Sequence, residues 1–464
     1  MRRPLLLVCS LWLLSGAASP QLVDKPSPQR IAILGTGYVG LVSGAGLADI
    51  GHHVVCADVV QEKIDKLNQG IMPIYEPGIK DLVIKNVEAG RLTFSSDVAQ
   101  AIRDANVIIT AVGTPMNENG EADLSALSEV IKALCQNLTS YKVICTKSTV
   151  PIGTNKKIKE ILSTKLGSNA SFDIVSNPEF LREGSALKDF FTTNPIVIGS
   201  DSEKALNIME DLYKPLVDNG VTLIKTDIAS AETIKYAWNS YSATKIAYVD
   251  ELSHLCNAVG ANISTVVNGM SFSEKLLPVR NVKPGPGFGG SCLPKDTAAL
   301  LAIGKKLGID LSIIAAVRKS NETHRQEILK EFYSLLGNSV AGKKIAILGL
   351  SFKANTDDIR YSPAIEMIQK LLNDGAKVYA YDPQAMNNMV KIISEITYCS
   401  SPEEALDHAD ALLVLTDWDE FKQLDLTHAA EIMAQRVIFD ARNIFDPSQL
   451  AQLDFSFKNL GYAY

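Results

Sequence analysis

The residue with the clearest chemical signature is Cys292. It follows a run of glycine and proline over residues 284–291 and precedes Pro294 and Lys295. That composition excludes a core strand or helix and indicates a shaped loop, and the proline suits the first turn of a following helix. A thiol at a helix N-terminus beside a lysine is expected to have a lowered pKa and to be nucleophilic. We therefore interpret Cys292 as a candidate nucleophile, and the other cysteines, which lie in apolar runs, as small buried side chains.

Two further groups have spacings that suit acid–base chemistry. Lys235 and Asn239 are four residues apart on a predicted helix and therefore share a face, with Glu232 beside them. A solvated Glu–Lys pair and a partly buried polar site both fit this pattern. Glu179 and Glu183 are also four apart, just after a predicted strand, where general acid–base work and a surface turn both fit the spacing.

A dinucleotide-binding fold is predicted to position these side chains. Residues 30–34 form a short apolar strand that leads directly into GTGYVG at residues 35–40. A small-residue helix over 39–50 follows, and then a strand over 54–57 that ends in Asp58. In such folds Gly35 makes the tight turn, Gly37 admits the pyrophosphate, Gly40 lets the helix pack on the strand, and the acid accepts hydrogen bonds from a ribose. The helix N-terminus supplies partial positive charge for the phosphates.

The remaining elements predict two domains joined by a helix. Strands over 106–112, 143–145 and 172–175 end in loops that should line one cleft at the carboxyl edge of a sheet. A helix over 230–259, with a second helical region over 296–336, is long enough to join two domains and to pair with a second subunit. Residues 343–349 then repeat the opening strand, and further strands follow at 378–381, 411–416 and 436–440. The loop after this repeat carries Lys353 in place of the three glycines, which predicts a different phosphate ligand.

Composition excludes several classes of protein. The chain has 46% hydrophobic and 21% charged residues and a net charge of −7, as an ordinary globular protein does. A mildly acidic chain has no general field for nucleic acid, and the cysteines have no metal-ligand spacing. Arg2, Arg3 and the apolar run over 5–14 resemble a secretory signal peptide, and an upstream start codon explains them equally well. No later stretch approaches the length of a membrane span.

Taken together, these motifs resemble the UDP-glucose/GDP-mannose 6-dehydrogenase family over residues 29–444. The resemblance rests on GTGYVGL at 35–41, PIYEPG at 73–78, STVP at 148–151, NPEFL at 177–181, FGGSC at 288–292 and FK at 352–353. It implies an α/β fold of two Rossmann-like doubly wound domains bridged by a long central helix. The implied boundaries are 1–28 for a leader-like segment and linker, 29–225 for the NAD-binding domain, 226–336 for a central dimerisation domain and 337–464 for a UDP-sugar-binding domain.

The resemblance also implies a reaction. Family members oxidise the C6 alcohol of a nucleotide sugar to a carboxylate with two NAD+, through a thiohemiacetal and a thioester on a cysteine. Cys292 matches that nucleophile, and Lys235, helped by Asn239, matches the group that stabilises the oxyanion. Glu179 and Asp296 match the carboxylates that assist hydrolysis, and Thr114 lies near the nicotinamide.

Two sets of binding residues follow from the same resemblance. The implied cofactor contacts are Gly35, Gly37, Tyr38, Val39, Gly40, Asp58, Lys63, Thr114, Glu183, Lys295 and Arg360. The implied substrate contacts are Glu179, Phe180, Leu181, Arg182, Glu183, Lys235, Asn239, Asn281, Val282, Lys283, Pro284, Gly285, Gly289, Phe352, Lys353 and Arg442. The implied partners are a nucleotide-sugar substrate and a second copy of the chain, with no nucleic acid, membrane or metal.

Some points stay open in the sequence. Many family members carry an arginine before the glycine-rich loop that reaches the neighbouring subunit's substrate, and here only Lys275 or Arg280 could replace it. Residues 291–296 and 350–354 also resemble GDP-mannose 6-dehydrogenases, whereas DARN at 440–443 resembles the UDP-glucose branch, which we favour. A catalytically idle nucleotide-sugar binding protein is a further alternative. We expect a cytoplasmic location, where NAD+ is available and the thiol stays reduced, with export as the alternative.

Overall fold

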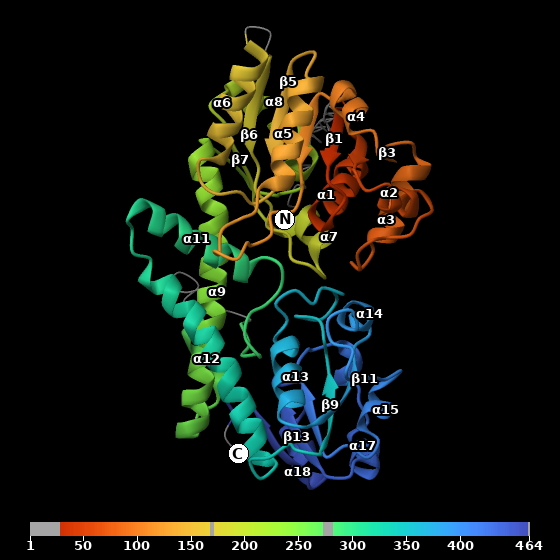
Figure 1. Cartoon of the computed structure of the whole chain (residues 1–464), viewed down its shortest axis with the longest axis vertical. Coiled ribbons are helices and arrows are strands. Elements are labelled where there is room, and N and C mark those ends of the chain that lie inside the picture. The colour runs from red at the N-terminus through yellow and green to blue at the C-terminus, as the bar shows by residue number, and fades with distance from the viewer. Residues whose placement is uncertain (1–27, 168–170, 272–281, 463–464) are drawn as a thin grey trace, which may run out of the picture.

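Two sheets at opposite ends of the molecule are joined by long helices (Figure 1). A computed structural model describes residues 28–167, 171–271 and 282–462. The leader-like segment, Lys275, Arg280 and Asn281 lie outside these ranges. Both sheets are wound from β and α elements in alternation, so the predicted fold class is confirmed.

The first sheet has eight strands in the order β3-β2-β1-β4-β5-β6-β7-β8, and all its neighbours are parallel except β6 and β7. Strands β4 and β5 are buried along their whole length, as expected of central strands covered on both faces. The strands are β1 (Arg30–Leu34), β2 (His53–Ala57), β3 (Leu92–Ser95), β4 (Val107–Thr110), β5 (Lys142–Thr146), β6 (Phe172–Ser176), β7 (Ile196–Gly199) and β8 (Leu223–Thr226). The helices are α1 (Tyr38–Asp49), α2 (Gln61–Asn68), α3 (Ile79–Glu88), α4 (Val98–Asp104), α5 (Ser125–Asn137), α6 (Thr154–Leu166), α7 (Ala186–Lys188), the π-helix η2 (Asp189–Thr193) and α8 (Glu203–Asp218).

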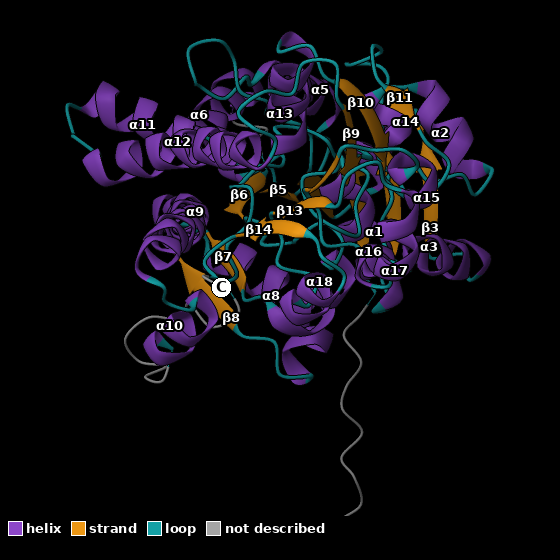
Figure 2. Cartoon of the chain, turned by 90° about the horizontal axis from the view of Figure 1, so that it is seen from below, coloured by secondary structure: helices purple, strands orange, loops and turns teal. Residues whose placement is uncertain are grey.

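The central helices run alongside both sheets and leave one side of α9 uncovered (Figures 1 and 2). They are α9 (Ile228–Val259), α10 (Ile263–Met270), α11 (Leu293–Leu307) and α12 (Ser312–Leu335). The predicted helix over 230–259 is therefore present. The predicted helical region over 296–336 is two helices, because Gly308 ends α11 in the left-handed conformation at φ 69° and turns the chain back.

The second sheet has six strands in the order β11-β10-β9-β12-β13-β14, and every pair is parallel. Its strands are β9 (Lys344–Leu348), β10 (Lys377–Tyr381), β11 (Thr397–Tyr398), β12 (Ala411–Val414), β13 (Val437–Asp440) and β14 (Ser456–Asn459). Its helices are α13 (Pro363–Asn373), α14 (Met386–Met389), α15 (Pro402–Leu406), α16 (Asp419–Lys422), α17 (Leu426–Ile432) and α18 (Pro447–Gln452).

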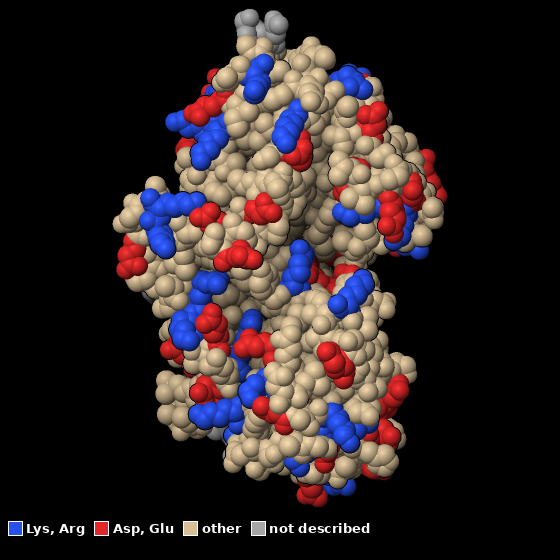
Figure 3. Space-filling view, in the orientation of Figure 1, with Lys and Arg blue, Asp and Glu red and all other residues tan. Residues whose placement is uncertain are grey.

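The surface and the helices add two observations. On the face in Figure 3, acidic and basic side chains are intermingled, and both kinds lie at the junction of the two domains. Among the helices that the structure describes, none combines the length and apolar character that a bilayer crossing requires.

Candidate active site

A cavity of about 630 Å³ lies at the carboxyl ends of β1, β4, β5 and β6. The loops after these strands line it together with the start of α11 and residues 359–361 of the second domain. The structure therefore brings the three predicted loops to one place. The predicted site residues that line this cavity are Gly37, Tyr38, Val39, Thr114, Glu179, Leu181, Glu183, Cys292, Lys295 and Arg360.

The glycine-rich turn at one end of the cavity has the geometry that a dinucleotide requires. Gly35 has φ 104°, and a Cβ there would lie 2.7 Å from the carbonyl oxygen of Ala111. A Cβ on Gly40 would lie 1.9 Å from the carbonyl oxygen of Gly35, so α1 packs against the turn only with glycine at this position. A Cβ on Gly37, in contrast, would meet no atom within 4 Å. The turn thus leaves open space where a pyrophosphate would approach the backbone.

Asp58 closes this turn from the end of β2. Its Oδ2 accepts hydrogen bonds from the backbone N–H of Thr36 at 2.9 Å and from its hydroxyl at 2.8 Å, and its Oδ1 accepts from Val60 N–H at 3.0 Å. Burial alone would raise the pKa of Asp58, but these hydrogen bonds and Lys63, 3.6 Å away, lower it. An ionised carboxylate therefore stands beside the turn, where the ribose of a dinucleotide would lie.

Cys292 occupies the predicted position, but its pKa shifts in the direction opposite to the prediction. It caps the N-terminus of α11, is half-buried and lines the cavity. Burial, and then the charges of Glu179 and Asp296, raise the pKa of the thiol, and Lys235 and Lys295 only partly offset them. The expected lowering of the pKa is therefore wrong for the free protein, because a helix N-terminus and a lysine do not outweigh burial next to two carboxylates.

Lys235 lies in the protein interior, only 3% exposed. Its Nζ donates to the backbone oxygen of Glu179 at 2.6 Å and to Oε1 of the same residue at 3.0 Å. Burial would lower the pKa of Lys235, but the charges of Glu179, Cys292 and Asp296 raise it, so the amine stays protonated. Glu232 is not its partner, since it accepts hydrogen bonds from Gly153 and Asn155 instead. The structure therefore favours the buried polar site over a solvated Glu–Lys pair.

Asn239 and Asp296 form a second buried pair. Nδ2 of Asn239 donates to Oδ2 of Asp296 at 2.5 Å, and Nζ of Lys295 contacts Oδ1 of Asp296 at 2.5 Å. Asp296 is 2% exposed and lies in the first turn of α11, one turn beyond Cys292. These contacts join α9 to the start of α11 and fix the face of α11 that carries the thiol.

Glu183 links the cavity to the second domain. It accepts hydrogen bonds from the hydroxyls of Ser291 at 2.9 Å and Thr356 at 3.2 Å, and Nη2 of Arg360 lies 3.5 Å away. Burial, and then the charge of Asp358, raise its pKa to about 7. Glu183 thus faces both the loop that carries Cys292 and the second domain.

The predicted substrate residues differ in their burial and in their partners. Phe180 is buried against Trp238, with ring centroids 5.2 Å apart, and Lys353 and Phe352 lie on the second-domain loop that faces Glu183. Arg442 is half-buried and donates to the backbone oxygens of Leu415 and Phe352. Arg182 instead forms a bidentate ion pair with Asp189, and Lys283 is exposed. In the glycine-rich loop, Pro284, Gly285 and Gly289 are buried and Val282 is half-buried.

Three family models match the chain. Their descriptions are the NAD binding domain, the central domain and the UDP binding domain of the UDP-glucose/GDP-mannose dehydrogenase family, and they match residues 29–217, 229–323 and 346–447. A UDP-glucose 6-dehydrogenase of Bacillus subtilis is 44% identical over 434 residues, which is 93% of each chain. The chain belongs to the UDP-glucose/GDP-mannose dehydrogenase family. It is an NAD-dependent oxidoreductase.

Two solved structures are similar to this dehydrogenase. A UDP-glucose dehydrogenase from Pyrobaculum islandicum matches with a TM-score of 0.87 and 32% identity, over 96% of this chain and 100% of that one. A UDP-D-ManNAc dehydrogenase from Pyrococcus horikoshii matches with a TM-score of 0.81 and 30% identity, over 93% of this chain and 99% of that one. Both have the two-sheet architecture in full, so the fold does not by itself select the sugar.

The structure of this dehydrogenase adds site residues that the sequence analysis did not select. Lys147 and Thr149 line the cavity, and they lie in a loop already predicted to face it. Glu76 is buried, and its carboxylate accepts hydrogen bonds from the backbone N–H groups of Gly184 at 2.6 Å and Ala186 at 2.7 Å and from the hydroxyl of Tyr38. Glu76 lies in the PIYEPG motif at residues 73–78, and that motif could have marked it as a site residue from the sequence.

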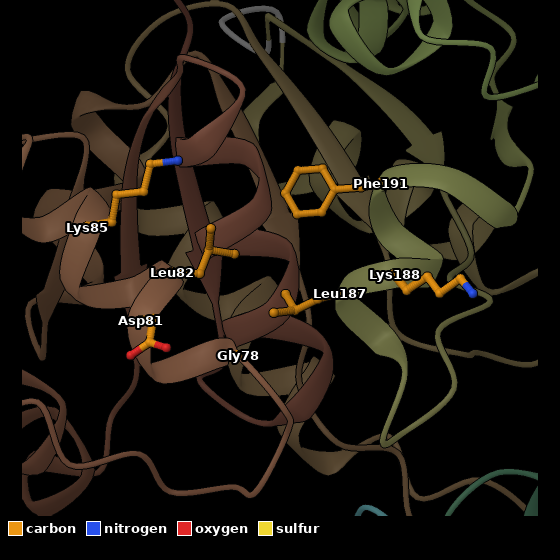
Figure 4. Close-up of a pocket in the computed structure, with 7 residues that line it drawn as sticks. All are labelled: Gly78, Asp81, Leu82, Lys85, Leu187, Lys188 and Phe191. Atoms are coloured by element: carbon orange, nitrogen blue, oxygen red, sulfur yellow. The ribbon is translucent and has the colours of Figure 1, made fainter.

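A second cavity of this dehydrogenase lies between α3 and α7 and has a volume of about 450 Å³ (Figure 4). Leu82, Leu187 and Phe191 form its apolar wall, and Lys85 at its edge pairs with Asp49 at 2.6 Å. None of the predicted site residues lines it. We therefore place the chemistry in the cavity that contains Cys292.

Proposed function

We propose that this chain oxidises UDP-glucose at C6 to UDP-glucuronate. One observation carries the proposal: Cys292 lines the same cavity as the open dinucleotide turn, with the charge of Lys235 acting on its sulfur from the protein interior. With NAD+ bound at that turn, the cavity would bring a hydride acceptor and the thiol to one carbon atom, and Lys235 would supply a cation that stabilises an oxyanion. The match to a UDP binding domain over residues 346–447 supports a uridine nucleotide.

The first half of the reaction produces an aldehyde and captures it. C6 loses a hydride and its hydroxyl proton, and the protonated Lys235 stabilises the negative charge that develops on the oxygen. The S–H bond of Cys292 then breaks as the sulfur forms a bond to C6, and the carbonyl oxygen takes up the thiol proton, which gives a thiohemiacetal. When bound, NAD+ accepts the hydride that each oxidation removes. Covalent capture keeps the reactive aldehyde in the cavity.

The second half releases the acid. The thiohemiacetal loses a hydride from C6 and its hydroxyl proton, which leaves a thioester on Cys292. Water then adds to C6, the carbon–sulfur bond breaks, and the sulfur regains a proton as the carboxylate leaves. Glu179 and Asp296 are close enough to the thiol to change its pKa, and we assign them to orient this water and accept its proton. Asn239 holds the carboxylate of Asp296 in place.

The stoichiometry of NADH tests this proposal. Purified protein is mixed with a limiting amount of UDP-glucose and excess NAD+, and NADH is measured by absorbance. We expect two NADH for each sugar. One NADH for each sugar would indicate a simple alcohol dehydrogenase, and none would indicate a nucleotide-sugar binding protein. GDP-mannose and a UDP-N-acetylhexosamine are measured in parallel, and a higher kcat/KM for either would reassign the substrate.

The variant Cys292→Ser tests the covalent route. We expect net turnover to fall by at least about a thousandfold, because an alcohol is a far weaker nucleophile than a thiol and cannot form the thioester. Cys135→Ser is the matched control, since this cysteine lies in α5 outside the cavity and its substitution should leave kcat unchanged. Full activity in Cys292→Ser would exclude the thioester mechanism.

The oligomer and the location are part of the same proposal. Helix α9 exposes Trp238, Tyr241, Tyr248 and Leu255, a row of large apolar side chains that supports pairing with a second copy. We assign the enzyme to the cytoplasm, because NAD+ and reduced thiols are available there. N-terminal sequencing of the mature protein checks the location, and loss of the leader-like segment would point to export.

A further inference from the structure

The backbone N–H and C=O of Gly285 are each held by a buried side chain. Oδ1 of Asp250 on α9 accepts a hydrogen bond from Gly285 N–H at 2.9 Å. Nε2 of His324 on α12 lies 2.6 Å from the carbonyl oxygen of Gly285. Asp250 is 1% exposed and His324 3% exposed, so neither bond competes with bulk water. The glycine-rich loop is therefore fixed to the two central helices at this residue.

The acceptors in this cluster determine where the protons lie. A carbonyl oxygen only accepts, so Nε2 of His324 carries the proton. Burial lowers the pKa of His324 to about 4, and the neutral ring therefore accepts through Nδ1, which lies 2.7 Å from Nε2 of His254. Nδ1 of His254 in turn faces Glu331 at 3.3 Å. The contact with Gly285 is thus the inner end of a chain of hydrogen bonds from the more exposed Glu331.

Gly285 also touches the second domain. A Cβ on Gly285 would lie 2.9 Å from Nη1 of Arg442, so the guanidinium lies against the bare Cα. Arg442 donates to the backbone oxygens of Leu415 and Phe352, which belong to the second domain. A shift of the Gly285 backbone would therefore change the space that the Arg442 guanidinium occupies.

The same helix holds the loop once more, closer to the thiol. Oδ1 of Asn321 on α12 accepts from Phe288 N–H at 2.7 Å, and its Nδ2 donates to the Phe288 oxygen at 3.1 Å. Asn321 and His324, three residues apart in α12, therefore hold Phe288 and Gly285, which are three residues apart in the loop. The Asn321 contact serves the segment that leads to Cys292, and the Asp250–His324 contact serves the segment against Arg442.

We propose that Asp250 and His324 are positioning residues for the nucleotide end of the substrate, acting through the Gly285 peptide and Arg442. The proposal rests on the proposed function and on the family resemblance, which implies that Gly285 and Arg442 contact the substrate. The contact that the proposal uses is the hydrogen bond from Gly285 N–H to Oδ1 of Asp250. Its Oδ2 is buried, no hydrogen-bond partner is found for it among the described residues, and burial raises the pKa of the carboxyl to about 7. A neutral acceptor of the same shape should hold Gly285 as well.

Paired substitutions test this proposal through steady-state kinetics. Asp250→Ala and His324→Ala remove the acceptor and the donor, and we expect each to raise KM for UDP-glucose about tenfold. Asp250→Asn and His324→Gln keep one acceptor and one donor in place and should stay within about threefold of the unsubstituted enzyme. KM for NAD+ should not change in any variant, because the dinucleotide turn is held by other residues. A thermal unfolding curve for each variant identifies any that fails to fold.

Two results would overturn the proposal: an unchanged KM for UDP-glucose in both alanine variants, or asparagine and glutamine variants as weak as the alanine ones. Amide hydrogen exchange over residues 284–290 gives a readout that needs no substrate. We expect faster exchange in the alanine variants and unchanged exchange in the conservative ones. If the unsubstituted protein does not oxidise UDP-glucose, the proposed function fails, and the exchange experiment still decides whether Asp250 and His324 hold the loop.

Discussion

The pKa of the Cys292 thiol is set by burial and by the charges of its neighbours. Burial contributes most to its raised pKa, Glu179 raises it further, and Lys235 lowers it. Glu179 and Lys235 are themselves an ion pair, with Nζ 3.0 Å from Oε1. The two charges therefore act on the same sulfur in opposite directions, and either can be removed separately.

Alkylation of Cys292 should respond to these two charges with opposite signs. We expect Glu179→Gln to speed the reaction of Cys292 with iodoacetamide at neutral pH by about threefold or more, because the loss of a negative charge lowers the pKa of the thiol. Lys235→Met should slow it by a similar factor, because the loss of a positive charge raises that pKa. Mass spectrometry of the peptide that contains Cys292 measures each rate without added NAD+.

Cys145 is the internal control for this measurement. It is fully buried, and burial raises its pKa to about 12, so it should stay unlabelled in all variants of the folded protein. Labelling of Cys145 would show unfolding. Equal rates at Cys292 in both variants would mean that neither charge reaches the sulfur.

At the scale of elements, the loop over residues 179–186 depends on a residue from a distant segment. Glu76, which precedes α3, accepts hydrogen bonds from the N–H groups of Gly184 and Ala186 and from the hydroxyl of Tyr38. Tyr38 begins α1 directly after the dinucleotide turn. One carboxylate therefore ties the loop that carries Glu179 and Glu183 to the cofactor turn.

Removal of this carboxylate should cost activity more than it costs the fold. We expect Glu76→Ala to lower kcat/KM for the nucleotide sugar by about a hundredfold, since it breaks two charge-assisted hydrogen bonds to the loop. Far-ultraviolet circular dichroism should be unchanged. Glu62→Ala on α2 is the matched control, because Glu62 is exposed and pairs with Lys66 across one helical turn. Equal activity in the two variants would remove Glu76 from the site.

The two βαβ turns show how far the sequence predicts function. Asp58 and Asp382 both end the second strand of their domain and both accept from a backbone N–H and a hydroxyl on the preceding loop. Asp382 accepts further hydrogen bonds from Gln384 N–H, Ala385 N–H and the indole of Trp418. The carboxylate of Asp382 is therefore occupied by hydrogen bonds from its own domain. The missing glycines predicted a different ligand there, but Trp418, 36 residues away, could not be anticipated from the motif.

Local patterns in the sequence predict elements, but they do not predict contacts between segments that are distant in the chain. The glycine spacing, the long helix and the repeated strand are local patterns, and the structure contains each of them. The partners of Lys235, Asn239 and Glu76 lie 56, 57 and 108 residues away in the chain. Such contacts depend on how segments that are distant in the chain pack together. The prediction of a lowered pKa for Cys292 was wrong because burial, the carboxylate of Glu179 from a distant segment and that of Asp296 outweigh the local helix terminus.

At the scale of the whole molecule, α9 both contributes to the active site and leaves an apolar row unpaired. Lys235 and Asn239 face inward, whereas Tyr241, Tyr248 and Leu255 are 42%, 49% and 57% exposed. These three positions are seven residues apart and therefore follow one stripe of the helix, the spacing of paired helices. Trp238 continues the stripe toward Phe180, so an interface on α9 would lie close to the site.

A charge in the middle of this stripe should separate the proposed dimer. Light scattering should give a mass of twice the 50.2 kDa chain for the unsubstituted protein. Tyr248→Glu should raise the dissociation constant at least about a hundredfold and give the mass of a single chain, because the interface would bury an unpaired carboxylate. Val87→Glu, on the exposed side of α3, adds the same charge elsewhere and should leave the dimer intact. If a dimer survives Tyr248→Glu, the interface lies on another surface. If the unsubstituted protein is a monomer, α9 does not pair with a second copy of the chain.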